Sequence, residues 1–337
     1  MPPIVVHLIR LRRNAIQAAA EAAREAGVWP EAGGEPGARA RTAGVVLKRA
    51  SMSRDNLVES VTFGAYAPRG LLKLTLMATR RCSTSWLGKR AAFLMRGLAM
   101  RGLRGRPVDV VSLGARMRLY PYNNNAEKRL LFTPQYFDPR ERAFLAERLK
   151  GDFVFLDVGA SVGGYALAIA AIGGPRARIL AVEPLPALFE RLAYNIGQSD
   201  FANVKAVSCA LADVDGEVTL FVNTYNQGES SVRIVSAEAR VEQLQVRAKT
   251  LLSLAHEEGY SKIDAIKLDV EGAEDLVLDP FLSTAPRTLW PRLIVMEFAL
   301  LRVGAQLEQR LRGLGYREIL RTGENVAYEL AEEETPA

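Results

Sequence analysis

The feature that most constrains the fold of this chain is residues 153–183, FVFLDVGASVGGYALAIAAIGGPRARILAVE. A short apolar run, a turn of small residues and an all-apolar segment follow one another, and a second apolar run ends at Glu183. Continuous apolar runs are typical of parallel strands that are covered on both faces. The segment between them ends in glycines and a proline, which predicts a buried helix. The stretch therefore predicts a strand–helix–strand unit of an open α/β sheet.

The carboxyl ends of these two strands are where an open α/β sheet binds its ligands. Small residues in the turn let a ligand approach the backbone, and the helix N-terminus offers N–H groups to an anion. An acid at the end of the second strand, here Glu183, suits a ribose diol. These features predict a nucleoside-containing ligand, while a turn that serves only packing is the alternative.

The turn also narrows the kind of nucleoside ligand. The dinucleotide motif G-x-G-x-x-G and the phosphate-binding motif G-x-x-x-x-G-K-[ST] are both absent. Asp157, at the end of the first strand, would repel a pyrophosphate. It suits the ammonium group of S-adenosylmethionine, whose carboxylate can use the helix N-terminus. We therefore predict S-adenosylmethionine as the cofactor.

Five blocks of the sequence carry a family resemblance: LDVGASVGGYALAIA, AVEPLPALFERLAYNI, ALADVDGEVTLF, IDAIKLDVEGAEDLVL and LIVMEF. In this order and spacing they resemble the FkbM-type methyltransferase family, from about residue 110 to 330. Ser161 is a departure, since the family usually has Asn there. The resemblance implies an α/β fold of the class I (Rossmann-like) methyltransferase type, a doubly wound sheet with an antiparallel C-terminal hairpin. It also implies an enzyme that methylates a hydroxyl of a small molecule, a sugar or a glycan.

Nine residues are expected to bind the donor. Asp157 and the glycine turn should hold its amino acid end, Glu183 its ribose hydroxyls, and the residues after the third strand its adenine. The Asp213 carboxylate fits an ordinary turn equally well. The expected cofactor-binding residues are Asp157, Gly159, Ala160, Ser161, Gly163, Glu183, Pro184, Ala210 and Asp213.

A second cluster of ionisable residues, Lys267, Asp269 and Glu271, ends the predicted fourth strand. In a strand these alternate positions share one face. A lysine among carboxylates is costly to bury unless it is paired. We predict Asp269 as the general base, Glu271 as a substrate contact and Lys267 as an orienting group, and a purely structural ion cluster is the alternative. Carboxylates also suit a divalent cation, but no metal is predicted.

Two further residues are expected to contact the acceptor substrate. Glu297 ends the predicted fifth strand and points to the same edge of the sheet, although packing alone would also explain it. Ser230 belongs to the polar, glycine-containing loop 223–231, and such loops often lie over binding sites.

Charge is distributed unevenly along the 337 residues, whose net charge is +6. Residues 1–150 carry 27 basic and 11 acidic residues, whereas the remainder carries 17 and 27. A basic segment attracts anionic partners, so we predict peripheral contact with an anionic membrane, with a solvated arginine-rich face as the alternative. No apolar run reaches the roughly 18 residues of a membrane-spanning helix. The two cysteines are far apart, which fits a reducing compartment and a cytoplasmic, membrane-peripheral protein.

The domain organisation follows from these patterns. Residues 1–44 read as a flexible basic leader, 45–106 as a basic helical extension, and 107–337 as the methyltransferase domain with its core at 151–330. At the start of that domain, Val108 to Tyr120 alternates like a β-hairpin, and Asp138 is expected to cap the next helix.

Other functions remain as alternatives. The missing dinucleotide motif and Asp157 count against a nucleotide-binding oxidoreductase. Asp269 is followed by Val-Glu-Gly and not by the Pro-Pro-aromatic sequence of amino-group methylases, so a nucleic-acid partner is disfavoured. A non-catalytic membrane-surface or partner-binding module would leave the intact site motifs unexplained. The acceptor is therefore expected to be a small molecule, a glycan or a glycolipid, and a homo-oligomer is left open.

Overall fold

The computed structural model describes residues 61–103, 105–122, 124–223, 230–232, 241–297 and 302–331. The predicted leader 1–44 and the start of the predicted extension lie outside these residues. The rest of the extension is a pair of helices, α3 (Gly70–Arg81) and α4 (Trp86–Leu103). Arg80 of α3 donates to the carbonyl oxygens of Val111 and Leu131, which attaches the pair to the following elements. Within the described part of the chain, no helix has the length and apolar character needed to cross a membrane.

The predicted hairpin is present as two antiparallel strands, β1 (Val108–Ser112) and β2 (Ala115–Leu119). Leu113 and Gly114 both adopt positive φ in the connecting turn, as a two-residue hairpin turn requires. Three helical segments follow: α5 (Asn125–Phe132), the 3-10 helix η1 (Pro134–Tyr136) and α6 (Pro139–Arg148). The sequence did not predict α5. It begins at Asn124, whose side chain accepts the N–H of Glu127 as an N-cap.

The central sheet has seven strands in the order β12-β13-β11-β10-β3-β4-β5. Five strands are parallel, and β13 runs antiparallel between β11 and β12. The predicted doubly wound sheet with an antiparallel C-terminal hairpin is therefore confirmed. Its strands are β3 (Val154–Val158), β4 (Arg178–Val182), β5 (Val204–Val207), β10 (Ala265–Leu268), β11 (Leu293–Glu297), β12 (Tyr316–Arg321) and β13 (Asn325–Leu330).

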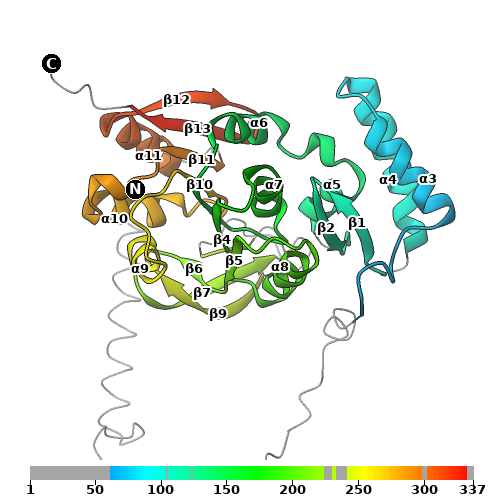
Figure 1. Cartoon of the computed structure of the whole chain (residues 1–337), viewed down its shortest axis with the longest axis horizontal. Helices are drawn as coiled ribbons and strands as arrows, with labels where there is room; N and C mark the ends of the chain where they lie inside the picture. The colour runs from blue at the N-terminus through cyan, green and yellow to red at the C-terminus, as the bar shows by residue number, and fades with distance from the viewer. Residues whose placement is uncertain are drawn as a thin grey trace, which may run out of the picture. The chain divides into compact units, whose positions relative to one another are not determined.

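Helices cover both faces of this sheet (Figure 1). Phe155 of β3 packs in a core with residues of α6, α7 and α8, whereas its neighbour Leu156 packs in a second core with α9, α10 and α11. Alternate residues of one strand thus serve two cores, which is why the strands read as continuous apolar runs. The remaining helices are α7 (Gly164–Gly173), α8 (Pro186–Gln198), α9 (Leu251–Glu257), α10 (Glu274–Thr284) and α11 (Arg302–Gly313).

A second, smaller sheet has the order β6-β9-β7-β8. The long strand β9, which pairs antiparallel with β7, was not predicted from the sequence. The sheet starts directly after β5, so its first strand, β6, begins at the same edge as the predicted ligand site. Its strands are β6 (Ala210–Leu211), β7 (Gly216–Asn223), β8 (Ser230–Ser231) and β9 (Val241–Lys249).

Candidate functional site

A cavity of about 340 Å³ lies at the carboxyl ends of the parallel strands. Eleven of the residues predicted for the site line it: Asp157, Gly159, Ala160, Ser161, Glu183, Pro184, Ala210, Lys267, Asp269, Glu271 and Glu297. Asp157 and Lys267, which are 110 positions apart in the sequence, share this space because β10 lies directly beside β3.

Three other residues predicted for the site are not found among the described residues of the cavity lining. Gly163 does not line the cavity; it adopts φ +96° before α7, where a Cβ would press on Leu167 and Leu192, so its role is in packing. Asp213 is exposed and does not line the cavity, whereas Leu211 does. The side chain of Ser230 lies outside the described residues.

The glycine turn lies directly against the segment that follows β10. Gly159 has φ +77°, and a Cβ on it would come within 2.0 Å of the backbone oxygen of Asp269. The N–H groups of Gly159 and Ala160 both donate to the carbonyl oxygen of Val182. The turn therefore joins the ends of β3, β4 and β10, and only glycine fits at its first position.

Asp157 is buried at the end of β3 and accepts a 2.8 Å hydrogen bond from the N–H of Ala166 in the first turn of α7. Burial raises the pKa of Asp157 to about 6, while Lys267 and this N–H act in the opposite direction. Its carboxylate thus anchors the helix N-terminus as well as lining the cavity. The sequence had predicted only the second of these roles.

Glu183 is buried at the end of β4 and holds the turn from the other side. Its two oxygens accept the N–H groups of Ser161 and Leu185, at 2.8 and 2.9 Å. Burial raises its pKa to about 7, and these two hydrogen bonds oppose the rise. The hydrogen bonds fix the carboxylate at the cavity wall, and its remaining lone pairs are available for hydroxyl donors.

Lys267 and Asp269 form an ion pair at the end of β10. Lys267 is 2% exposed, and its Nζ lies 2.9 Å from Oδ2 of Asp269, which is 44% exposed. Burial lowers the pKa of the lysine, but Asp269 and Asp157 together raise it above its ordinary value. The lysine therefore stays charged beside these two carboxylates.

Asp269, Glu271 and Glu297 gather their carboxylates, with ligand oxygens all within 4.8 Å of one another. The prediction that Glu271 shares a strand face with Asp269 was wrong, because β10 ends at Leu268 and Glu271 adopts φ +53°. Burial, together with the charges of Asp269 and Glu274, raises the pKa of Glu297 to about 7. Three carboxylates at this spacing could hold a hard divalent cation.

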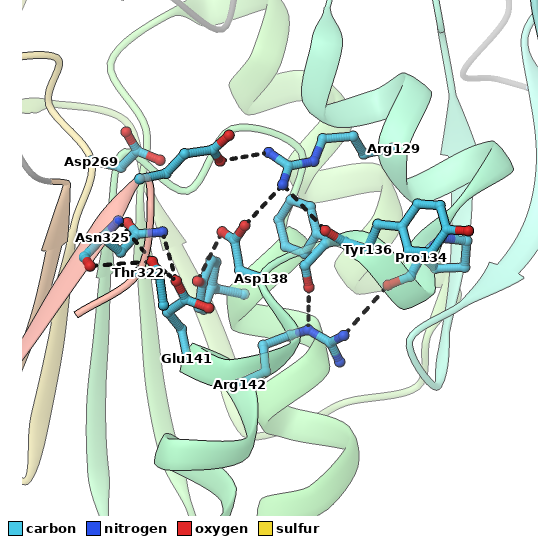
Figure 2. A network of polar contacts seen from close by, with 12 residues as sticks. Arg129, Pro134, Tyr136, Asp138, Glu141, Arg142, Asp269, Thr322 and Asn325 are labelled. Atoms are coloured by element: carbon cyan, nitrogen blue, oxygen red, sulfur yellow. Dashed lines mark hydrogen bonds and ion pairs between the residues drawn. The ribbon is translucent and has the colours of Figure 1, made fainter. Parts of the chain in front are cut away.

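A polar network at the cavity wall was not predicted (Figure 2). Arg129 of α5 pairs with Asp138 and with Glu324 of the β12–β13 turn, each at 3.1 Å. The hydroxyl of Tyr165 donates to the second oxygen of Asp138 at 2.9 Å. Arg129, Asp138, Tyr165 and Glu324 all line the cavity.

This network corrects the expected role of Asp138. It occupies the N-cap position of α6, but its side chain makes no capping hydrogen bond there. Its oxygens are taken by Arg129 and Tyr165 instead. Arg129 and Glu324 are 195 positions apart, and no local pattern in the sequence signals such a pair.

Comparison with known proteins identifies the family of this region. Residues 157–318 match the family model described as the methyltransferase FkbM domain. The chain is 30% identical over 151 residues to methyltransferase sdnD of Sordaria araneosa, covering 36% of this chain and 58% of that protein. It is also 30% identical over 164 residues to the AMB antimetabolite synthetase AmbE of Pseudomonas aeruginosa. This match covers 39% of this chain and 8% of that protein. The aligned segments thus span less than two thirds of each curated relative.

Among solved structures, the human methyltransferase 10 domain containing protein overlaps with a TM-score of 0.40 and 14% identity, covering 74% of this chain and 100% of that one. The sheet order, and not this overlap, establishes the fold class. The family match confirms the resemblance read from the sequence. For residues 157–318 it also supports the predicted methyltransferase class.

Proposed function

Since residues 157–318 belong to the methyltransferase FkbM domain family, we propose that this protein transfers the methyl group of S-adenosylmethionine to a hydroxyl of a small molecule, sugar or glycan. The observation that carries the proposal is the contact between the glycine turn and the Lys267–Asp269 pair, at one end of a single cavity. A donor held by the turn would then present its methyl group beside a carboxylate. Positioning of this kind supplies much of the acceleration of an in-line displacement.

The donor would be held by the residues around the turn. Asp157 offers its carboxylate to the ammonium of the donor, and the first turn of α7 faces the donor carboxylate. Glu183 accepts from the ribose hydroxyls, and Pro184 and Ala210 line the wall beside it. Asp213 would reach the adenine only from outside the cavity. The hydroxyl of Ser161 lies 3.4 Å from the side-chain nitrogen of Asn124, so this position remains polar without the amide usual in the family.

The transfer step needs a base because an alcohol is a weak nucleophile. The hydroxyl oxygen attacks the methyl carbon, the carbon–sulfur bond breaks, and its electron pair stays on sulfur as neutral S-adenosylhomocysteine. The proton of the hydroxyl passes to Asp269, which is exposed to the cavity and held in place by Lys267. Glu271 and Glu297 are positioned to accept hydrogen bonds from the acceptor. No part of this step requires a metal ion.

The setting of the reaction is also a proposal. We place the protein in the cytoplasm, at the surface of an anionic membrane, because residues 1–150 are strongly basic. A glycan or glycolipid acceptor is compatible with that setting. The polar wall formed by Arg129, Asp138 and Glu324 would contact the hydroxyl-rich part of such an acceptor.

The test is methyl transfer by the intact protein and by Asp269→Asn. Methyl-labelled S-adenosylmethionine is incubated with separated lipid, glycan and small-molecule fractions of the source cell, and labelled products are analysed for O-methyl groups. Asp200→Asn is the matched control, since Asp200 is exposed and does not line the cavity. We expect label in one fraction with the intact protein and the control. Asp269→Asn should reduce the rate about 100-fold or more, the range of general-base catalysis. Equal rates for all three would contradict the role of Asp269, and N-methyl products would contradict the hydroxyl acceptor.

A further inference from the structure

The helix pair α3–α4 has an apolar surface that the described residues do not cover. Six large apolar side chains are each more than 60% exposed: Leu71, Leu74, Trp86, Leu87, Leu94 and Leu98. Of the 18 residues of α4, only Ala92 and Leu103 are buried. Large exposed apolar side chains gathered on one helix pair indicate a site of contact with a partner or a membrane.

The same two helices are basic and lack acidic residues. Residues 70–103 contain seven Lys and Arg residues and no Asp or Glu. Several basic groups lie over aromatic rings, with Arg90 4.5 Å from the ring of Trp86 and Arg96 4.6 Å from that of Phe93. This arrangement of aromatic and aliphatic side chains with flanking cations is typical of helices that lie at a membrane interface.

Charge also decides between possible occupants of this surface. A second copy of the chain would bring seven positive charges against seven, which disfavours a dimer through this face. The segment 1–60 carries nine basic and six acidic residues, so it too is net positive. An anionic lipid surface complements both the charge and the apolar character of the helices.

The geometry of α4 fits a helix that lies on a bilayer and does not cross it. At 18 residues it is about 27 Å long. Its four basic residues prevent insertion across the hydrocarbon core, in keeping with the lack of any spanning helix in the described part of the chain.

Contacts connect this surface to the wall of the cavity. Phe93 of α4 packs edge-on against Tyr136, whose hydroxyl donates to the carbonyl oxygen of Ser83 at 2.6 Å. The carbonyl oxygen of Tyr136 accepts from Arg129, which lines the cavity (Figure 2).

We propose that the exposed apolar and basic face of α3–α4 docks on an anionic lipid bilayer. This rests on the membrane contact proposed above and assigns it to a defined surface. Docking fixes the catalytic domain at the membrane through helices that are hydrogen-bonded to it, and an acceptor carried by the bilayer is brought close to the cavity wall.

The test is flotation with vesicles of equal parts phosphatidylcholine and phosphatidylglycerol, compared with vesicles of phosphatidylcholine alone. The full-length protein should float with the mixed vesicles only. The triple variant Leu87→Gln, Leu94→Gln and Leu98→Gln should lower the partition coefficient on the order of 100-fold, because it removes three inserted side chains. The matched control, Ile172→Gln, Val214→Gln and Ile319→Gln, changes three exposed apolar residues elsewhere and should float like the parent.

A charge variant keeps the test independent of the apolar substitutions. Lys89→Glu with Arg90→Glu should weaken binding to the mixed vesicles on the order of tenfold or more. Donor binding and far-ultraviolet circular dichroism should stay unchanged in all variants, which shows that they are folded. Because flotation needs no methyl transfer, failure of the proposed reaction would leave this result unaffected. The proposal is overturned if the parent does not float, if it floats equally with phosphatidylcholine alone, or if the leucine variant floats like the control.

Discussion

Replacing Gly159 with alanine tests the contact on which the site is built. Two contributions lower the stability of the folded state at this position. A non-glycine residue at φ +77° costs roughly 1–2 kcal/mol. The new Cβ would also lie 2.0 Å from the backbone oxygen of Asp269. A backbone atom cannot move aside as a side chain does, so overpacking costs about 1–3 kcal/mol more. We therefore expect Gly159→Ala to lower the free energy of unfolding by about 2–5 kcal/mol in total.

The matched control is Gly151→Ala. Gly151 has φ +72°, but a Cβ there meets nothing within 4 Å, so only the backbone cost of roughly 1–2 kcal/mol applies. Urea unfolding followed by circular dichroism measures both variants, and calorimetric titration with S-adenosylmethionine measures donor binding. Gly159→Ala should lose more stability than the control and should bind the donor more weakly. If the two variants lose equal stability, the turn does not touch the Asp269 backbone in solution and the reasoning is refuted.

Three further perturbations have defined outcomes. Burial raises the pKa of Glu183 and of Glu297 to about 7, so these groups stabilise the fold fully below their unfolded pKa near 4.5, and this stability is lost as pH rises towards 7. Glu183→Gln should therefore flatten the pH dependence of the urea midpoint over that range, and an unchanged slope would contradict the raised pKa. Asp109 is paired with fully buried Arg118 at 2.7 Å, so Asp109→Asn should cost about 3–5 kcal/mol in urea unfolding. Asp200→Asn, in an exposed pair, should cost no more than about 1 kcal/mol, and equal losses would contradict the burial argument. Treatment with EDTA should leave methyl transfer unchanged, whereas a loss that Mg²⁺ restores would assign a cation to the carboxylate cluster.

Most of the central sheet could be predicted from the sequence because its strands are covered on both faces. Val154 to Val158 is buried throughout, so the strand appears as a run of apolar residues, interrupted only by Asp157, that is followed by glycine. The hairpin β1–β2 was predicted for a different reason, namely its alternation and the Leu113-Gly114 turn. In each case a local sequence pattern is enough to predict the strands.

Strand β9 was missed although a signal was present. Leu244, Val246 and Ala248 alternate with polar residues, and the last two are buried. Helix α5 was missed although its N-cap is local, since the side chain of Asn124 accepts the N–H of Glu127. Both elements thus carry a local signal in the sequence.

The candidate site also has one part that the sequence predicts and one part that it does not. Asp157, Glu183 and Asp269 stand at strand ends, and the order of strands in an open sheet brings such ends together. Arg129 and Glu324 meet only because α5 and the β12–β13 turn lie on the same side of the cavity. Such tertiary pairs leave no trace in residue spacing, so the polar wall formed by Arg129, Asp138 and Glu324 could not be predicted.

The most direct test of the central claim is calorimetric titration of S-adenosylmethionine into the intact protein, Glu183→Gln and Glu217→Gln. Glu217 is exposed and does not line the cavity, so it serves as the control. The account predicts one donor per chain, unchanged affinity for Glu217→Gln, and about tenfold to 100-fold weaker binding for Glu183→Gln, which loses a charged hydrogen-bond acceptor. Equal affinity for all three proteins would place the donor elsewhere, and no binding to the intact protein would contradict the assignment of residues 153–183 as the donor site.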